Sequence, residues 1–397
     1  MNSSLYQKLL RELEQRKSKK LLRELKAFRT NKIDFSSNDY LGLNFEGIMN
    51  QFLLDALENY KKSEIMLGST GSRLISGQRE IFEEVEKQFS LFIKNSDSLY
   101  FTNGYTANLS TIFALLTPKD YAIVDQYCHA SILDGIRISR AKKIYFRHND
   151  STHLEEIIKK IRKKDSKNFI WIFTEAIFSM DGDSPHLEQI ILISKKYDCA
   201  IFLDEAHSIG IVGEKGVGFS SNWNLQGECS VITYPLGKAI GLMGCFVVGD
   251  SLLKQYLINF ARGFVFSTAI PILILYILQR VISYLSTEEA EKKRKKVKEL
   301  SDYAREQLQR NGYHTGFSNS HIIPILIGDE EETLKLSEYL KKRNFNVVAI
   351  RPPTVPLGTS RIRLNIHSHN TKEEIDQFIY EINQYRSKQK SINNNIG

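Results

Sequence analysis

One lysine in this chain lies between glycines, in surroundings that favour chemistry. Lys238 occurs in the stretch Thr233-Tyr-Pro-Leu-Gly-Lys-Ala-Ile-Gly-Leu-Met-Gly244, between the apolar runs Ser230–Ile232 and Cys245–Val248. Most lysines are solvated, but apolar neighbours exclude water and lower the pKa of the amine. A partly neutral lysine can form an imine with a carbonyl cofactor. Lys238 is therefore the first candidate catalytic residue.

A lysine imine with a pyridoxal-type cofactor needs a carboxylate at the ring nitrogen, a site for the phosphate and a flat group against the ring. Asp204 directly follows an apolar run, and His207 lies three residues further on. The helix N-terminus that Asn103 would open favours an anion, and His129 could stack on the ring. Each of these residues, taken alone, could instead be a helix cap or a surface side chain.

The segments around these candidates alternate between strand and helix patterns. Helix-length stretches separate several of the apolar runs, which is typical of βαβ units and a mainly parallel sheet. Ligands of such sheets bind at the carboxyl ends of the strands, where the candidates occur. The seven predicted strands are Ser98–Phe101, Ala122–Val124, Lys143–Phe146, Phe169–Thr174, Ala200–Leu203, Ser230–Tyr234 and Cys245–Val248.

The pattern changes before and after this region. An opening amphipathic helix is expected from a capping box at Ser4 to about Phe28, packing on the body or on a partner chain. After Pro271 long helices are expected, at Ile272–Leu285 and Glu288–Arg310, followed by a smaller α/β unit. We expect an N-terminal helical segment at 1–50, a large cofactor-binding domain at 51–275, a small C-terminal α/β domain at 276–388 and a disordered tail at 389–397.

Composition narrows the class of protein. The 397 residues are 42% hydrophobic with a net charge of +8, and they show no nucleic-acid motif. Four scattered cysteines argue against a disulfide framework or a zinc knuckle, and the start of the chain is polar, so we expect a cytoplasmic protein. The longest apolar stretch, Phe264–Leu278, is too short to span a bilayer. The sequence lacks the Gly-x-Ser-x-Gly and His-Glu-x-x-His motifs of two hydrolase classes.

From about Asp34 to Ile379 the chain resembles the α-oxoamine synthases, a family of pyridoxal-phosphate enzymes of fold type I. The resemblance implies a mainly parallel seven-stranded sheet in a large domain and a smaller C-terminal α/β domain. The matching stretches are Phe35–Leu43, Gly71–Gly77, Asn103–Asn108, His129–Ser131, His148–Asp150, Thr174–Asp183, Asp204–His207, Gly237–Ala239, Ser267–Thr268 and Arg351–Arg363.

The resemblance also implies a role for each matching residue. Lys238 would hold pyridoxal 5'-phosphate, Asp204 would pair with the ring nitrogen, and His129 would stack on the ring. The remaining implied roles are as follows: His207 and Ser179 at the ring phenolate oxygen, the backbone of Gly104 and Tyr105 at the phosphate, Thr268 reaching the phosphate of a partner subunit in a homodimer, Glu175 near the cofactor, Arg361 at the amino-acid carboxylate, and Asn38 in the substrate site.

The activity implied is a decarboxylating condensation of an amino acid with an acyl thioester, carried by coenzyme A or by an acyl carrier protein. The Arg351-Pro-Pro-Thr-Val-Pro356 stretch favours L-alanine and a pimeloyl thioester, a step of biotin synthesis. The alternative activity uses glycine or serine with another acyl chain. The alternative from a different functional class is a structural subunit without catalytic activity. Where the family usually has Ser or Thr three residues before the lysine, this chain has Pro235, which lacks both a hydroxyl and an N–H.

Overall fold

The central element of the fold is a seven-stranded sheet. The computed structural model describes residues 2–18, 21–23, 25, 27–28, 31–59, 67–95, 97–223 and 225–394. All seven predicted strands are present, within a residue or two of the predicted bounds. They are β2 (Asp97–Phe101), β3 (Tyr121–Asp125), β4 (Lys142–Phe146), β5 (Ile170–Glu175), β6 (Ala200–Asp204), β7 (Val231–Pro235) and β8 (Cys245–Gly249).

The order of the strands creates a crevice at one edge of the sheet. The order is β2-β8-β7-β6-β5-β3-β4, and β8 alone runs antiparallel to its neighbours. From β3 the chain moves outward to β4 and then returns to β5 on the other side of β3. A ligand of an open parallel sheet binds at such a reversal, outside the carboxyl ends of the strands. The segments after β3 and β5 are therefore the first places to look for a site.

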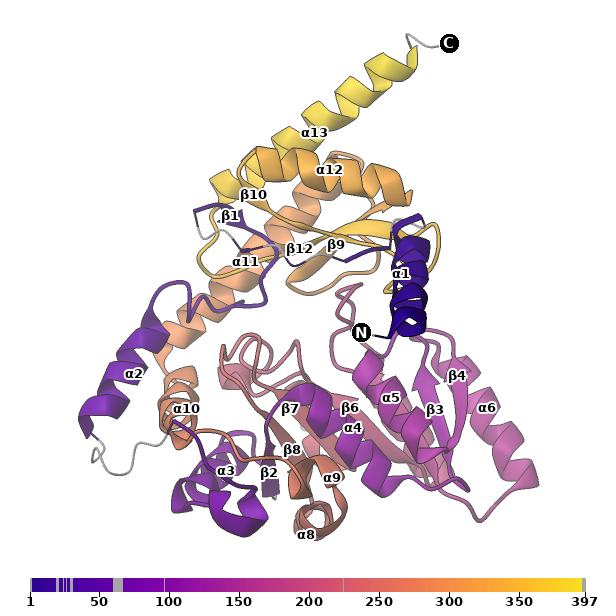
Figure 1. Ribbon diagram of the computed structural model, residues 1–397, viewed down its shortest axis with the longest axis vertical. Helices are drawn as coiled ribbons and strands as arrows, with labels where there is room; N and C mark the ends of the chain where they lie inside the picture. Colours follow the sequence, from indigo (N-terminus) through magenta and orange to yellow (C-terminus); the bar gives the residue numbers. More distant parts are fainter. Residues whose placement is uncertain are drawn as a thin grey trace.

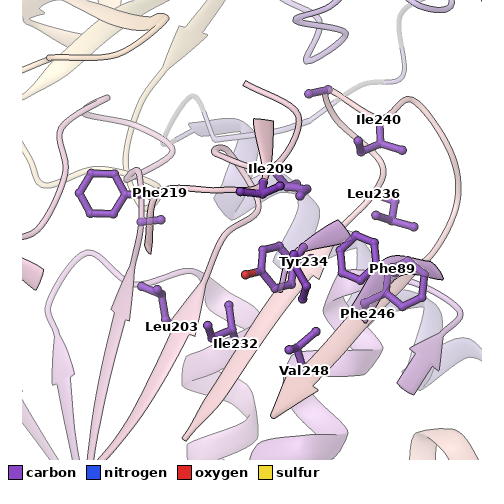
Figure 2. Close-up of a cluster of buried hydrophobic side chains, with 14 of the residues drawn as sticks. Phe89, Leu203, Ile209, Phe219, Ile232, Tyr234, Leu236, Ile240, Phe246 and Val248 are labelled. Carbon is purple, nitrogen blue, oxygen red and sulfur yellow. The ribbon is translucent and has the colours of Figure 1, made fainter. Parts of the chain in front are cut away.

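Helices cover both faces of this sheet, as the alternating pattern predicts (Figure 1). Tyr234, Phe89 and Phe246 pack on one face, where the rings of Phe89 and Phe246 stack with centroids 3.9 Å apart (Figure 2). The other face packs on α4, α5 and α8. The helices of this region are α2 (Ile48–Asn59), α3 (Glu80–Phe92), α4 (Gly104–Leu115), α5 (Ala130–Ser139), α6 (Ser151–Lys164), α7 (Leu187–Tyr197), α8 (Ser251–Phe260) and α9 (Arg262–Val265), with short turns of helix at Arg73–Gly77, Glu214–Gly216, Ser220–Trp223 and Gln226–Glu228.

The apolar stretch after Pro271 forms α10 (Ile272–Leu285), with the predicted bounds. Leu275, Leu278 and Val281 are fully buried in it. α10 packs on α3 and α2 and also contacts α11. Within the part of the chain that the structure describes, no helix combines the length and apolar character needed to cross a membrane.

A second, smaller sheet lies beside the first (Figure 1). Its order is β11-β12-β9, and α11, α12 and α13 pack with it around a core that includes Phe378. The N-terminal β1 pairs with β10 of this unit and buries Phe35 in the same core. The bounds are β1 (Ile33–Asp34), α11 (Glu288–Arg310), β9 (Ile322–Gly328), α12 (Glu330–Lys342), β10 (Phe345–Asn346), β11 (Val348–Ile350), β12 (Ser360–Asn365) and α13 (Lys372–Asn394).

Two predictions at the ends of the chain are wrong. α1 covers only Ser3–Ser18, and its cap is Asn2, whose Oδ1 accepts a hydrogen bond from the backbone N–H of Ser4. None of its side chains is buried, so no face of this helix is covered by the rest of the chain. Without a buried apolar face, local helix propensity alone does not extend the helix to Phe28. At the other end α13 continues to Asn394, so residues 389–394 are helical rather than disordered.

Candidate active site

The predicted site residues meet at the carboxyl ends of β5, β6 and β7. Glu175 and Asp204 are the last residues of neighbouring strands and lie in register, and Thr233 of β7 is in register with Asp204. Lys238 follows β7 by three residues, on a loop closed by a 3.0 Å hydrogen bond from the Leu236 N–H to the Gly244 carbonyl. The sheet thus brings together three candidates that are up to 63 residues apart in sequence.

The amine of Lys238 is withdrawn from solvent. Burial lowers the pKa of Lys238, although the negative charges of Asp204 and Glu175 oppose this shift. Among the described residues the amine has no hydrogen-bond or ion-pair partner. A lysine that is available and partly neutral at physiological pH is what covalent attachment of an aldehyde requires.

Glu175 lies fully inside the site, with 3% of its surface exposed. Its Oε1 accepts a hydrogen bond from the backbone N–H of His129, which ties the end of β5 to the start of α5. Burial and the nearby Asp204 raise the pKa of Glu175. Glu175 can therefore hold a proton close to Asp204 and Lys238.

Asp204 is held by its own strand end and by α4. Its Oδ1 accepts from the Ala206 N–H at 2.9 Å, and its Oδ2 accepts from the amide nitrogen of Asn108 at 2.6 Å. Asn108 also donates to Ser131 Oγ at 2.9 Å, and Ser131 Oγ lies 2.8 Å from Nδ1 of His129. Partial burial and the charge of Lys238 lower the pKa of His129, while Asp204 opposes them. Of the four residues in this series of hydrogen bonds, Asp204 and His129 were predicted from the sequence as functional residues. Asn108 and Ser131 were not.

His207 faces a second polar group that comes from outside the sheet. Its Nδ1 lies 2.7 Å from the hydroxyl of Tyr40, which lies 3.0 Å from Oδ1 of Asn38. Burial raises the pKa of Tyr40 to about 12 and lowers that of His207 well below its usual value. Both side chains are therefore neutral at physiological pH. Asn38, predicted from the resemblance to lie in the substrate site, is thus close to His207.

Two arginines of β12 enter the site from the small sheet. Arg361 pairs with Asp181, its Nη1 2.5 Å from Oδ1, and its Nε donates to the Thr359 carbonyl. Arg363 donates to Asn38 Oδ1 at 3.2 Å and to the Ser179 carbonyl at 2.6 Å. The charge of Arg363 lowers the pKa of both Lys238 and His207, so it lies near the reacting groups. The sequence prediction named Arg361 and missed Arg363, although a two-residue spacing on a strand places both on one face.

The N-terminus of α4 has the character of a phosphate site. Asn103 caps it by accepting from the Thr106 N–H at 2.9 Å, whereas the N–H groups of Gly104 and Tyr105 have no hydrogen-bond partner among the described residues. Free N–H groups at a helix N-terminus bind anions. Pro235 lies directly against this turn, since a Cβ on Gly104 would lie 2.8 Å from both its Cβ and its Cγ. The free amides, the aspartate and the lysine together fit pyridoxal phosphate.

A cavity of about 660 Å³ opens beside His129, at the reversal between β3 and β5. Its lining includes His129, Ser179 and Asp181, and the segment Pro353–Pro356 from the small unit. The predicted residue Ser179 is therefore at the site, on the same cavity as His129. A space of this size suits a small organic substrate.

Among the described residues, no hydrogen bond joins the Thr268 side chain to another predicted site residue. Thr268 is exposed, and its backbone forms an isolated bridge with Ser72. Around it, Ile75 is 84% exposed and Phe266 is 70% exposed, which is unusual for apolar side chains of this size. The expectation that Thr268 serves a partner subunit remains a prediction.

A half-buried charged group outside the predicted set packs against the wall of the cavity. His148 lies between Asp125 and Asp183, with nitrogen–oxygen distances of 2.9 and 2.8 Å, and these hydrogen bonds raise its pKa to about 10 even though burial opposes the rise. Its ring packs on Tyr127 and Phe178, which both line the cavity. The charged histidine fixes the wall of the site rather than reacting in it.

A separate group of Asp34, His367 and His369 has the composition of a metal site. However, Nδ1 of His367 faces the Asn370 Oδ1 at 3.1 Å and its Nε2 faces the Ser37 carbonyl at 3.0 Å. Both ring nitrogens therefore already have oxygen partners. This group ties the N-terminal segment to the loop after β12.

Comparisons with known proteins agree with this geometry. Residues 30–382 match the family model for aminotransferase class I and II. A putative 8-amino-7-oxononanoate synthase of Geobacillus kaustophilus is 35% identical over 378 residues, covering 93% of this chain and 94% of that protein. An 8-amino-7-oxononanoate synthase of Lysinibacillus sphaericus is 33% identical, covering 88% of this chain and 87% of that protein.

Solved structures resemble the whole chain. Serine palmitoyltransferase of Sphingomonas wittichii has a TM-score of 0.84 at 25% identity, covering 96% of this chain and 97% of that one. 8-Amino-7-oxononanoate synthase of Francisella tularensis has a TM-score of 0.76 at 26% identity, covering 91% and 99%. Serine palmitoyltransferase of S. paucimobilis, solved with a PLP–myriocin aldimine, has the same fold at 24% identity, a TM-score of 0.84 and coverage of 96% and 97%. The chain therefore belongs to the aminotransferase class I and II family, and within it to the α-oxoamine synthases, acyltransferases of fold type I that depend on pyridoxal phosphate.

Proposed function

We propose that this enzyme joins L-alanine to a pimeloyl thioester with loss of carbon dioxide, and so forms 8-amino-7-oxononanoate for biotin synthesis. The observation that carries the proposal is the similarity, over 87–93% of this chain and at 33–35% identity, to proteins named 8-amino-7-oxononanoate synthase. The Arg351–Pro356 stretch lines the substrate cavity through Pro353–Pro356 and supports the same assignment.

The residues that would hold the cofactor follow from the geometry of the site. Lys238 would hold it through Nζ, Asp204 would keep a proton on the ring nitrogen, and the N–H groups of Gly104 and Tyr105 would bind the phosphate. When bound, pyridoxal phosphate supplies the electron sink that stabilises negative charge at the amino-acid Cα. The ring of His129 would cover the cofactor, and His207 would contact its phenolate oxygen, with Ser179 nearby.

Lys238 would also move the proton. Once the substrate amine has replaced it, its amine is free to take the Cα proton, because burial keeps its pKa below the usual value for lysine. The same amine can return a proton after carbon dioxide has left. Glu175, whose pKa is raised, keeps a further proton in the site without adding a second negative charge beside Asp204.

We assign the amino-acid carboxylate to Arg363 in place of Arg361. The guanidinium of Arg361 already carries an ion pair with Asp181, whereas the partners of Arg363 are neutral oxygens. A neutral partner is displaced at lower cost than a carboxylate, so Arg363 is better able to accept a substrate anion. Asn38, which now accepts from Arg363, would then lie next to the bound amino acid.

We further propose a homodimer with shared active sites. The exposed apolar side chains around Thr268 would be buried by a second copy of the chain, which would place Thr268 toward the phosphate of the other subunit. Size measurement in solution tests this step: a dimer that dissociates on Ile75→Glu and Phe266→Glu substitution is expected, and a monomeric wild-type enzyme would contradict it.

One experiment separates the proposed substrates. The enzyme is supplied with L-alanine, glycine or L-serine, each with pimeloyl-CoA, a pimeloyl carrier protein, acetyl-CoA or palmitoyl-CoA, while release of thiol and carbon dioxide is followed. Turnover is expected for L-alanine with a pimeloyl thioester and is abolished in Lys238→Ala. Serine palmitoyltransferase activity is the second candidate, because the similarity in shape to that enzyme is greater, with a TM-score of 0.84 against 0.76. Faster turnover of L-serine with the palmitoyl thioester would replace our proposal by that one.

A further inference from the structure

A continuous chain of buried hydrogen bonds joins the two sides of the cofactor site. It runs from the Asp204 carboxylate through the Asn108 amide and the Ser131 hydroxyl to Nδ1 of His129, with distances of 2.6, 2.9 and 2.8 Å. Asn108 is 1% exposed and Ser131 is fully buried, so water does not compete for either. The chain links the residue below the expected ring nitrogen with the residue expected to cover the ring.

The donors and acceptors in this series of hydrogen bonds can be assigned in only one consistent way. The Asn108 side chain must present its nitrogen to Asp204, because its carbonyl oxygen would be repelled by the carboxylate. The second proton of that nitrogen goes to Ser131 Oγ, which leaves the Ser131 hydroxyl proton for Nδ1 of His129. The backbone N–H of Ser131 also donates to Nδ1, at 3.2 Å. A proton on Nδ1 would therefore face two donors.

We propose that Asn108 and Ser131 are positioning residues that fix His129 in the tautomer with its proton on Nε2, so that the ring presents a donor to the substrate cavity. The inference rests on the proposed function only for the identity of the ligand that this donor would meet. Nε2 has no hydrogen-bond partner among the described residues, and His129 lines the cavity of about 660 Å³. An N–H in this place suits an anionic oxygen of the substrate, such as a carboxylate or a developing enolate.

The arrangement also limits what His129 can do. A ring nitrogen that carries a proton donates a hydrogen bond and does not accept one. His129 therefore cannot remove the Cα proton through Nε2 in the resting enzyme, and this task is left to Lys238. His207 differs, because the single proton of the Tyr40 hydroxyl can go either to Asn38 or to His207.

The tautomer can be measured directly. The enzyme is labelled with ¹⁵N-histidine and studied both before and after loading with pyridoxal phosphate. Two-bond ¹⁵N–¹H correlations report which nitrogen carries the proton. The His129 signals are assigned by their loss in His129→Gln. In wild-type enzyme we expect the Nε2–H form between pH 6 and 8. In Ser131→Ala and in Asn108→Leu we expect the Nδ1–H form to become visible, and in Ser131→Thr, which keeps the hydroxyl, we expect it to be absent.

The turnover number kcat provides a second measurement, which separates a positioning role from a purely structural one. Loss of one buried hydrogen bond should lower kcat about tenfold in Ser131→Ala, with recovery in Ser131→Thr. Ser110→Ala, which changes a buried serine on α4 outside this series of hydrogen bonds, is the control and should leave the His129 tautomer unchanged. A wild-type Nδ1–H form, or the same Nε2–H form in both Ser131→Ala and Asn108→Leu, would overturn the inference. Because the tautomer is read without turnover, this result is independent of whether the proposed substrates are right.

Discussion

Replacing Pro235 by threonine should strengthen cofactor binding. Pro235 ends β7 and lies against the first turn of α4, close enough that a Cβ on Gly104 would be 2.8 Å from its ring carbons. A hydroxyl on the same carbon framework would reach the two free N–H groups and any phosphate that they bind. Proline offers that phosphate neither a hydroxyl nor an N–H.

The size of the effect can be worked from one contact. A hydrogen bond to a charged group contributes about 1.5–3 kcal/mol, which corresponds to about a 10- to 150-fold lower dissociation constant for pyridoxal phosphate. Removing the proline also lowers the free energy of unfolding by about 0.4–1 kcal/mol, because the unfolded chain gains conformational freedom. It also creates a new backbone N–H. Pro235→Val has the shape of the threonine variant without its hydroxyl, so it carries both of these costs and serves as the matched control.

The assay is a titration of the cofactor-free enzymes with pyridoxal phosphate, followed by absorbance. We expect the threonine variant to bind at least about tenfold more tightly than the valine variant, with the wild type close to valine. Equal dissociation constants for threonine and valine would show that the phosphate does not lie beside residue 235. That result would refute the placement of the phosphate at the N-terminus of α4.

Three further predictions follow from single contacts. Gly104→Ala should weaken cofactor binding and cost about 1–3 kcal/mol of stability, because its Cβ would overlap Pro235, and adding Pro235→Gly should restore thermal stability. Arg363→Lys should raise the KM for the amino acid about 10- to 150-fold, while Arg361→Lys should change it much less; the reverse order in steady-state kinetics would return the carboxylate to Arg361. The pKa of His148 is raised to about 10 from an unfolded value near 6.5, so its contribution to stability is full below pH 6.5 and is lost as the pH rises through 10. The melting temperature of His148→Gln should accordingly fall furthest below that of the wild type near pH 6 and approach it near pH 10, and a difference that grows with pH would contradict the assignment.

The sheet and the residues at its strand ends could be predicted from the sequence. Seven apolar runs separated by helix-length segments gave strands within a residue or two of those in the structure, and α10 has its predicted bounds. Asp204 could be predicted because a polar residue directly after a buried strand lies at the carboxyl edge of the sheet, whereas Glu175 was predicted from the family resemblance. The helical end of the chain was missed, since a polar amphipathic helix such as the end of α13 differs little in composition from a disordered tail.

The partners of these residues could not be predicted in the same way. Asn108 lies on α4 and Ser131 on α5, and nothing in their spacing shows that Asn108 reaches Asp204 or that the two side chains meet. These contacts exist because α4 and α5 pack against each other on one face of the sheet. Arg361 and Arg363 have the same spacing pattern and the same strand face. Only the position of Asp181 distinguishes them, because it neutralises one and leaves the other facing neutral oxygens.

The same reasoning explains why Pro235 is informative. Its effect on the site depends on how close β7 comes to α4, a distance that no local pattern encodes. In the structure the proline ring fills the space next to the helix N-terminus, so the phosphate would have to depend more on backbone N–H groups than on a side-chain hydroxyl. Backbone donors lose little entropy when they bind, because the helix holds them in place before the phosphate arrives. A site built in this way can tolerate the loss of one hydroxyl, and the threonine and valine variants measure how much that hydroxyl would have added.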